Sequence, residues 1–210
     1  MNEQKRQCCT AFQGNRCIAS GNVLNVIRKT KEVIDQGTQD SILIFDDATS
    51  EIIEADFRGT AENVIQKFKK SMTEEPSDND LPNMEQKSQR RPGRPKLGVV
   101  GREVTLLPRH WEWLSDQPGG ASVTLRKLVE EARRANRGRD KIRRCQESAY
   151  RFMSAMAGDL PGFEEASRAL FAEDSKRFND YIAVWPEDLK KHVEKISKGV
   201  FENSKDRKIL

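Results

Sequence analysis

Residues 42–57 read ILIFDDATSEIIEADF, and this stretch decides the fold of the N-terminal part of the chain. Residues 42–45 form an uninterrupted apolar run, which is typical of a buried strand. Residues 46–50 supply turn formers, and a second strand is predicted over 52–57. Two adjacent carboxylates, Asp46 and Asp47, can in principle hold a divalent cation. Because aspartates in a turn ordinarily bond their own backbone, we favour the turn.

Working outward from this stretch, a small α+β module is predicted over residues 8–70. Two short strands at 10–12 and 16–19 flank a Gly14-Asn15 turn, which indicates a hairpin. A helix follows from 22 to 36, with apolar residues on one face and Gly37 as its stop. Another helix, capped by Thr60, follows the strand at 52–57. The order ββαββα is typical of a small antiparallel sheet covered by two helices.

The remainder of the chain divides into four segments by composition. Residues 71–100, rich in proline and polar side chains, are predicted to be a disordered linker. Residues 101–137 follow the order strand, helix, loop and longer helix, with the strand at 104–107, the first helix starting at Pro108 and Ser122 capping the second. Apolar spacings of three and four predict a helical domain over 138–200. Residues 201–210 are predicted to be a flexible tail.

Charge is distributed unevenly along this chain of 210 residues and net charge +4. Residues 90–144 carry 15 basic and 6 acidic side chains, whereas residues 71–89 carry 1 basic and 5 acidic. A concentrated basic block is typical of a protein with a polyanion partner, usually nucleic acid. No apolar run reaches the length of a transmembrane helix, and the first residues show no signal peptide. We therefore expect a cytoplasmic protein without a membrane partner.

The segment 90–96 reads RRPGRPK and contains the Gly-Arg-Pro core of an AT-hook. The narrow minor groove of AT-rich DNA concentrates negative potential and admits an extended peptide with inserted arginines. Glycine lets the backbone approach closely, while proline holds it extended. The usual Arg-Gly-Arg-Pro order is interrupted here by Pro92. A basic linker that only separates domains is the alternative.

Residues 102–134 resemble a ribbon-helix-helix DNA-binding unit, with one strand, two helices and a Gly-x-Ser turn at 120–122. In that fold two chains pair their strands into a ribbon that enters the major groove, and the second helix offers its first amides to a phosphate. The resemblance implies a homodimer with Thr105 on the outward face of the ribbon. Against it, Glu103 would repel phosphate. The bulky Trp111 and Trp113 are more typical of a core or a dimer interface, so a structural or dimerising role is the alternative.

A second basic run, 133–144, carries seven positive charges and a single acid, Asp140. A solvated helix face ordinarily interleaves the two signs, so this run favours contact with a polyanion.

Residues suited to metal binding or catalysis are scarce. The chain has four cysteines and two histidines: Cys8, Cys9, Cys17, Cys145, His110 and His192. Their spacing fits no zinc site, and free thiols in a reducing compartment are expected. Nothing resembles a nucleophile elbow, a P-loop or a dinucleotide motif. The sequence therefore predicts no enzyme activity, no metal and no cofactor.

Six segments are distinctive: TAF at 10–12, FDDAT at 45–49, PGRPKLGVV at 92–100, EVTLLPRHW at 103–111, QPGGASV at 117–123 and YRFMSAMAGDLPGFE at 150–164. Together they resemble a family of bacterial conserved proteins catalogued as a domain of unknown function. The resemblance covers nearly the whole chain. It implies no activity and no site residues.

These features predict a DNA-binding transcriptional regulator or nucleoid-associated protein, with a preference for AT-rich DNA and a homodimeric state. The alternative is a non-enzymatic interaction adaptor whose basic segment binds an acidic partner or the chain's own residues 71–89. A ligand of the N-terminal module stays open. The candidate nucleic-acid-binding residues are Arg90, Arg91, Gly93, Arg94, Lys96, Arg102, Thr105, Ser122, Arg126, Lys127, Arg133, Arg134, Arg137 and Arg139.

Overall fold

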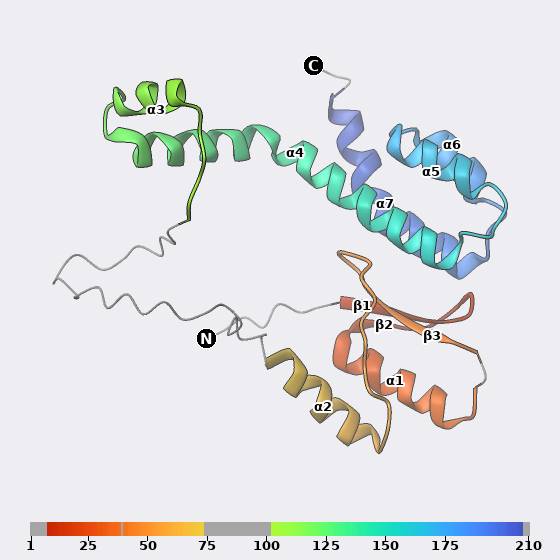
Figure 1. Cartoon of the computed structure of the whole chain (residues 1–210). Coiled ribbons are helices and arrows are strands. Elements are labelled where there is room, and N and C mark those ends of the chain that lie inside the picture. Colours follow the sequence, from red (N-terminus) through yellow and green to blue (C-terminus); the bar gives the residue numbers. More distant parts are fainter. Residues whose placement is uncertain (1–7, 39, 74–101, 208–210) are drawn as a thin grey trace. The chain divides into compact units, whose positions relative to one another are not determined.

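The computed structural model describes residues 8–38, 40–73 and 102–207, without the side chains of 73 and 203–207 (Figure 1). Its elements are β1 (Cys8–Gln13), β2 (Arg16–Asn22), α1 (Val23–Asp35), β3 (Ile42–Asp46), α2 (Ala61–Thr73), α3 (Pro108–Ser115), α4 (Gly120–Met156), α5 (Phe163–Phe171), α6 (Ser175–Ile182) and α7 (Glu187–Arg207). The chain forms two compact units. Of the described residues, those up to 73 and those from 137 onward form one unit, and 102–136 belong to the other.

The three strands form one antiparallel sheet in the order β2-β1-β3. Gly14, with φ of 52°, lies in the tight turn between β1 and β2, and the predicted hairpin is confirmed. The predicted strand at 52–57 is wrong, because only an isolated bridge joins Ile52 to Phe45. Past this bridge, the Asp56 carboxylate accepts bonds from the backbone amide and the guanidinium of Arg58.

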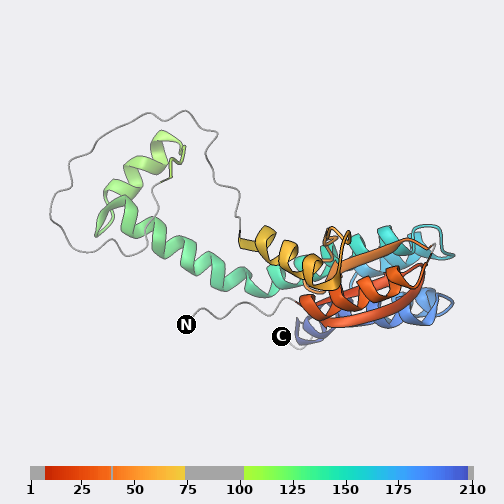
Figure 2. The same ribbon diagram turned by 90° about the horizontal axis from the view of Figure 1, so that it is seen from below.

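Each face of the sheet is covered by helices (Figures 1 and 2). On one face, Cys9, Ala11 and Ile44 pack with apolar side chains of α1 and α2. On the other face, Phe12 and Phe45 pack with side chains of α4, α5, α6 and α7. Neighbouring residues of a strand point to opposite faces, which explains why Ala11 and Phe12 belong to different cores. The helical C-terminal region therefore shares a core with the N-terminal sheet.

Helix α4 runs without a break from Gly120 to Met156. Its second half approaches α7 closely, because a Cβ added at Gly199 of α7 would lie 2.7 Å from Cys145 Sγ of α4. After α4, the indole nitrogen of Trp185 donates to the carbonyl of Pro161 at 2.9 Å and so secures the chain around α5 and α6. The predicted helical character of the C-terminal region is confirmed.

In the unit that contains α3, residues 102–107 are irregular in the single chain. The predicted ribbon pairs this segment with a second chain, so the strand stays a prediction. The predicted cap at Ser122 is wrong, because Ser122 lies inside α4. Gly119 and Gly120 have φ of 89° and 73° and reverse the chain, so the helix starts at Gly120. The predicted helix start at Pro108 is confirmed.

Within the described ranges, no helix is long and apolar enough to cross a membrane.

Candidate nucleic-acid interface

Seven basic residues lie on one side of α4, and we call this set the basic stripe. At 3.6 residues per turn they fall within an arc of about 120° around the helix axis. The basic stripe consists of Arg126, Lys127, Arg133, Arg134, Arg137, Lys141 and Arg144. Because α4 is one continuous helix, this alignment follows from helical periodicity alone.

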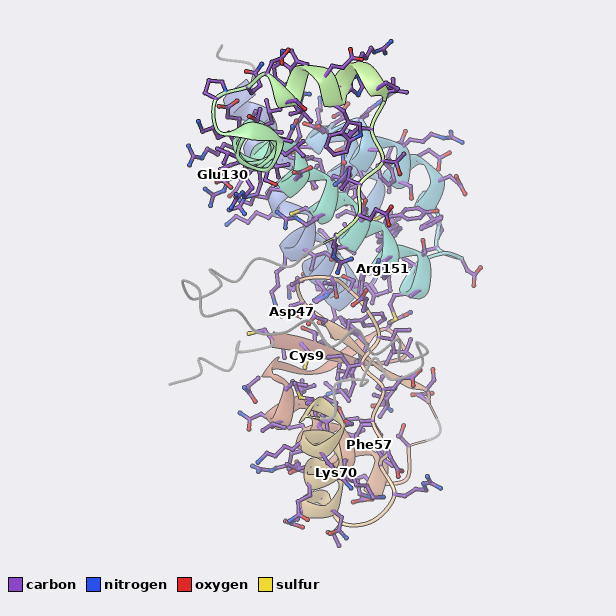
Figure 3. All side chains as sticks on the ribbon, turned by 60° about the vertical axis from the view of Figure 1, so that its left-hand side comes forward. Cys9, Asp47, Phe57, Lys70, Glu130 and Arg151 are labelled. Atoms are coloured by element: carbon purple, nitrogen blue, oxygen red, sulfur yellow. The ribbon has the colours of Figure 1, made fainter. Side chains whose placement is uncertain are left out.

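Every side chain of the basic stripe is exposed. One acid, Glu130, lies among them and forms weak ion pairs with Arg133 at 3.8 Å and Arg134 at 3.4 Å (Figure 3). Both arginine side chains keep 77% of their surface exposed, so these pairs leave them available to another anion. Two more guanidinium groups are held by backbone carbonyls one turn earlier: Arg126 by Ser122 and Arg144 by Asp140. These bonds orient the arginines and leave their charge uncompensated.

Arg139, a predicted site residue, projects from the opposite side of α4, together with Arg143. Arg143 contacts Asp140 at 3.4 Å and Glu147 at 3.9 Å. The basic run 133–144 places Arg139 with its neighbours because charge is counted there along the chain. Helical periodicity through residue 138 separates Arg139 from the basic stripe and assigns Lys141 and Arg144 to it.

Of the predicted site residues that the structure describes, Arg102, Thr105 and Ser122 do not belong to the basic stripe. Arg90, Arg91, Gly93, Arg94 and Lys96 lie outside the described residues. Arg102 and Thr105 are exposed on the irregular segment before α3. Ser122 lies in the first turn of α4, next to the backbone amides at the start of that helix.

Residues 102–136 expose an apolar surface. In this range the structure buries one large hydrophobic side chain, Leu114. Six others are exposed, and they are Val104, Leu107, Trp111, Trp113, Leu128 and Val129. Trp111 and Trp113 are therefore not core residues of the single chain, and their place in a dimer interface stays a prediction.

The adjacent carboxylates after β3 form a turn. Asp46 Oδ1 accepts from the amides of Ala48 and Thr49 at 2.8 and 2.9 Å, which confirms the prediction. Asp47 accepts from the Thr10 hydroxyl of β1 and from the Lys195 ammonium of α7, both at 2.7 Å. Among the residues described, no group of three or more metal-ligating side chains comes together.

The same turn is tied to α4. The hydroxyls of Ser50 and Ser148 are 2.8 Å apart in the buried interior, and the Arg151 guanidinium donates to the carbonyl of Thr49. Figure 3 shows Asp47 and Arg151 at this junction between the sheet and the helices. The polar groups of this turn therefore stabilise the packing of the sheet against α4 and α7.

Two buried ionisable groups are shifted by their surroundings. His192 packs against the rings of Phe12 and Phe152, and its Nε2 atom lacks a partner among the described residues. Burial lowers the pKa of His192 to about 4. Burial, with Asp47 nearby, raises the pKa of the Cys9 thiol to about 12. At neutral pH His192 is uncharged and Cys9 is an unreactive thiol.

By its architecture, the protein is an α+β protein whose three-stranded antiparallel sheet carries helices on both faces. By sequence, the chain belongs to the family described as "Uncharacterized protein conserved in bacteria (DUF2239)", which matches residues 8–197. This confirms the resemblance found in the sequence. No curated protein and no solved structure matches the chain.

Proposed function

We propose that this protein binds DNA, and that the basic stripe of α4 is its principal contact with the phosphate backbone. The observation that carries the proposal is the alignment of seven exposed basic side chains on one side of a single helix. An α-helix fits the width of the major groove.

Phosphate contacts make affinity depend on salt, because each neutralised phosphate releases condensed counterions. If five to seven residues of the basic stripe contact phosphates, the logarithm of the association constant falls with the logarithm of salt concentration at a slope of about −4 to −6. Such contacts position a protein on DNA without reading its sequence. The stripe therefore supports a nucleoid-associated protein more directly than a sequence-specific regulator.

Fluorescence anisotropy on a labelled duplex of about 20 base pairs tests the proposal between roughly 50 and 200 mM salt. The variant Arg126→Gln/Arg133→Gln/Arg137→Gln should bind on the order of tenfold or more weakly, and its salt slope should be smaller by about 3. The matched control Arg28→Gln/Lys191→Gln/Lys198→Gln removes the same charge from exposed sites on α1 and α7. Equal losses in both variants would leave only a general charge effect and would refute the basic stripe as the contact.

A preference for AT-rich DNA is proposed from the RRPGRPK segment at 90–96. Comparing AT-rich with GC-rich duplexes tests it, and Arg94→Ala should abolish the preference while leaving the salt dependence of the α4 contact. If Arg94→Ala binds AT-rich DNA as the parent does, the segment is only a linker.

The predicted homodimer is supported by the exposed apolar surface of residues 102–136, and we propose that a second copy of the chain covers it. With one large buried hydrophobic side chain, this unit buries too little apolar area to be stable alone. Its six basic and five acidic side chains nearly cancel, so two copies would not repel each other. Sedimentation equilibrium should show a dimer that Leu128→Glu/Val129→Glu dissociates and Val184→Glu, on the other unit, does not. A monomeric parent protein would refute it.

A further inference from the structure

Two exposed aromatic side chains lie together on the unit formed with residues 137–207. Tyr150 of α4 is 42% exposed and Phe171 at the end of α5 is 51% exposed. Their ring centroids are 5.6 Å apart at an interplanar angle of 57°, and Phe163 supports Tyr150 from 6.3 Å. Neither Tyr150 nor Phe171 belongs to the two hydrophobic cores. The stability of the fold therefore does not explain their exposed faces.

The aromatic pair is held by rigid elements. The amide of Gln146, one turn before Tyr150 on α4, donates to the carbonyls of Leu170 and Phe171 at 3.1 and 3.4 Å. These bonds satisfy carbonyls at the end of α5 and fix that end against α4. Because the rings are already oriented, stacking a planar ligand on them costs less side-chain conformational entropy than stacking it on mobile rings.

Exposed arginines flank the pair. Arg139 and Arg143 lie on the same side of α4 as Tyr150, eleven and seven residues before it, which is about 16 and 10 Å along the axis. Arg168 is exposed on α5, one turn before Phe171. This side of α4 is opposite to the basic stripe, so these arginines are not needed for the proposed duplex contact.

We propose that Tyr150, Phe171, Arg139, Arg143 and Arg168, named here the stacking platform, bind single-stranded nucleic acid. Bases stack on the open faces of the two rings, and the arginines bind the neighbouring phosphates. Stacking on aromatic side chains beside positive charge is how proteins hold single strands without reading their sequence. In a duplex the base faces are covered by their neighbours, so the rings select unpaired strands. This inference rests on the proposed function only in taking nucleic acid as the ligand class, since it uses different residues.

Anisotropy of the full chain on a labelled oligothymidylate of about 20 nucleotides, longer than a typical single-strand site, tests the stacking platform. The variant Tyr150→Leu/Phe171→Leu should bind the oligothymidylate roughly 10- to 100-fold more weakly, while its duplex affinity stays unchanged. The matched control Tyr150→Phe/Phe171→Tyr keeps both rings and should bind as the parent does. If the leucine variant does not fold, Arg139→Gln/Arg143→Gln provides the second test, and it should weaken binding of the single strand and not of the duplex.

The outcomes separate this inference from the proposed function. A leucine variant that binds the oligothymidylate within twofold of the parent, or a parent that fails to bind it at low salt, overturns the stacking platform even if the basic stripe binds duplex DNA. If single-strand binding depends on the rings while the triple variant of the basic stripe binds duplex normally, the stacking platform stands and the proposed function fails.

Discussion

The two halves of α4 contain similar residues in a single helix, but the apolar side chains of one half are buried and those of the other are exposed. The half after Arg137 buries Ile142, Ala149, Phe152 and Met153 in the core beside the sheet. The half before it leaves Leu128 and Val129 exposed. An apolar side chain becomes core only where another element covers it, so periodicity fixes the apolar face and tertiary packing decides whether that face is buried. The uncovered half keeps both its apolar and its basic side chains available to partners.

The largest effect expected from this contrast is on stability. Phe152 is fully buried. Its ring centroid lies 5.3 Å from that of Phe12, 5.0 Å from that of Phe45 and 4.5 Å from that of His192. Phe152→Ala should lower the free energy of unfolding by about 3–5 kcal/mol, because it removes buried area and leaves a cavity. Val129→Ala, at a site that is 64% exposed, should cost less than about 0.5 kcal/mol. Urea unfolding of dilute protein measures both. A large cost for Val129→Ala would show that the first half of α4 is covered in solution.

The same contrast explains which elements the sequence predicts correctly. The β1–β2 hairpin, α1, β3 and α2 depend on local signals, such as the turn at Gly14 and the Thr60 hydroxyl that accepts from the amide of Asn63. The strand expected at 52–57 has suitable side chains, but a strand exists only where a neighbour accepts its hydrogen bonds. The sequence does not reveal that this segment is bridged to the sheet at Ile52 alone.

The candidate site is predictable to a similar extent. Counting charge along the chain locates the basic block, but the side of α4 on which each residue projects depends on the helix being unbroken at Gly138. For that reason the charge count places Arg139 beside Arg137, although the two side chains project from opposite sides of the helix. The contact between Tyr150 and Phe171 joins residues from two helices, and no local pattern in the sequence predicts it.

A second test of the packed half uses pH. His192 has an ordinary pKa of 6.5 that burial lowers to about 4, so between these values the unfolded chain binds a proton that the folded chain excludes. Stability should therefore fall as pH drops from about 6.5 to 4, with a contribution of about 3 kcal/mol from this residue. In His192→Leu, the difference in unfolding free energy between pH 7 and pH 4.5 should be smaller by most of this amount. An unchanged difference would mean that His192 is not excluded from solvent.

A third test addresses the contact between α4 and α7. A Cβ at position 199 would lie 2.7 Å from Cys145 Sγ, well inside van der Waals contact. Gly199→Ala should therefore destabilise the protein by about 1–3 kcal/mol, the range for an overpacked interior. Removing the sulfur should relieve the clash, so Cys145→Ala/Gly199→Ala should be more stable than the sum of the single changes predicts. Additive losses in thermal or urea unfolding would contradict the close packing of these helices.

The smallest expected effect tests whether the two halves form one helix. Gly138 lies where they meet, and a Cβ added there would meet no atom within 4 Å. In a continuous helix, Gly138→Ala should stabilise the protein by about 0.5–1 kcal/mol, because alanine loses less backbone entropy than glycine on forming a helix. Duplex affinity should be retained, since the alignment of the basic stripe does not change. A loss of stability in urea unfolding, or a marked loss of duplex affinity, would mean that the helix bends at Gly138 in solution. In that case Arg126 and Arg133 would no longer be aligned with Arg137 and Arg144, and the basic stripe would divide into two separate anion contacts.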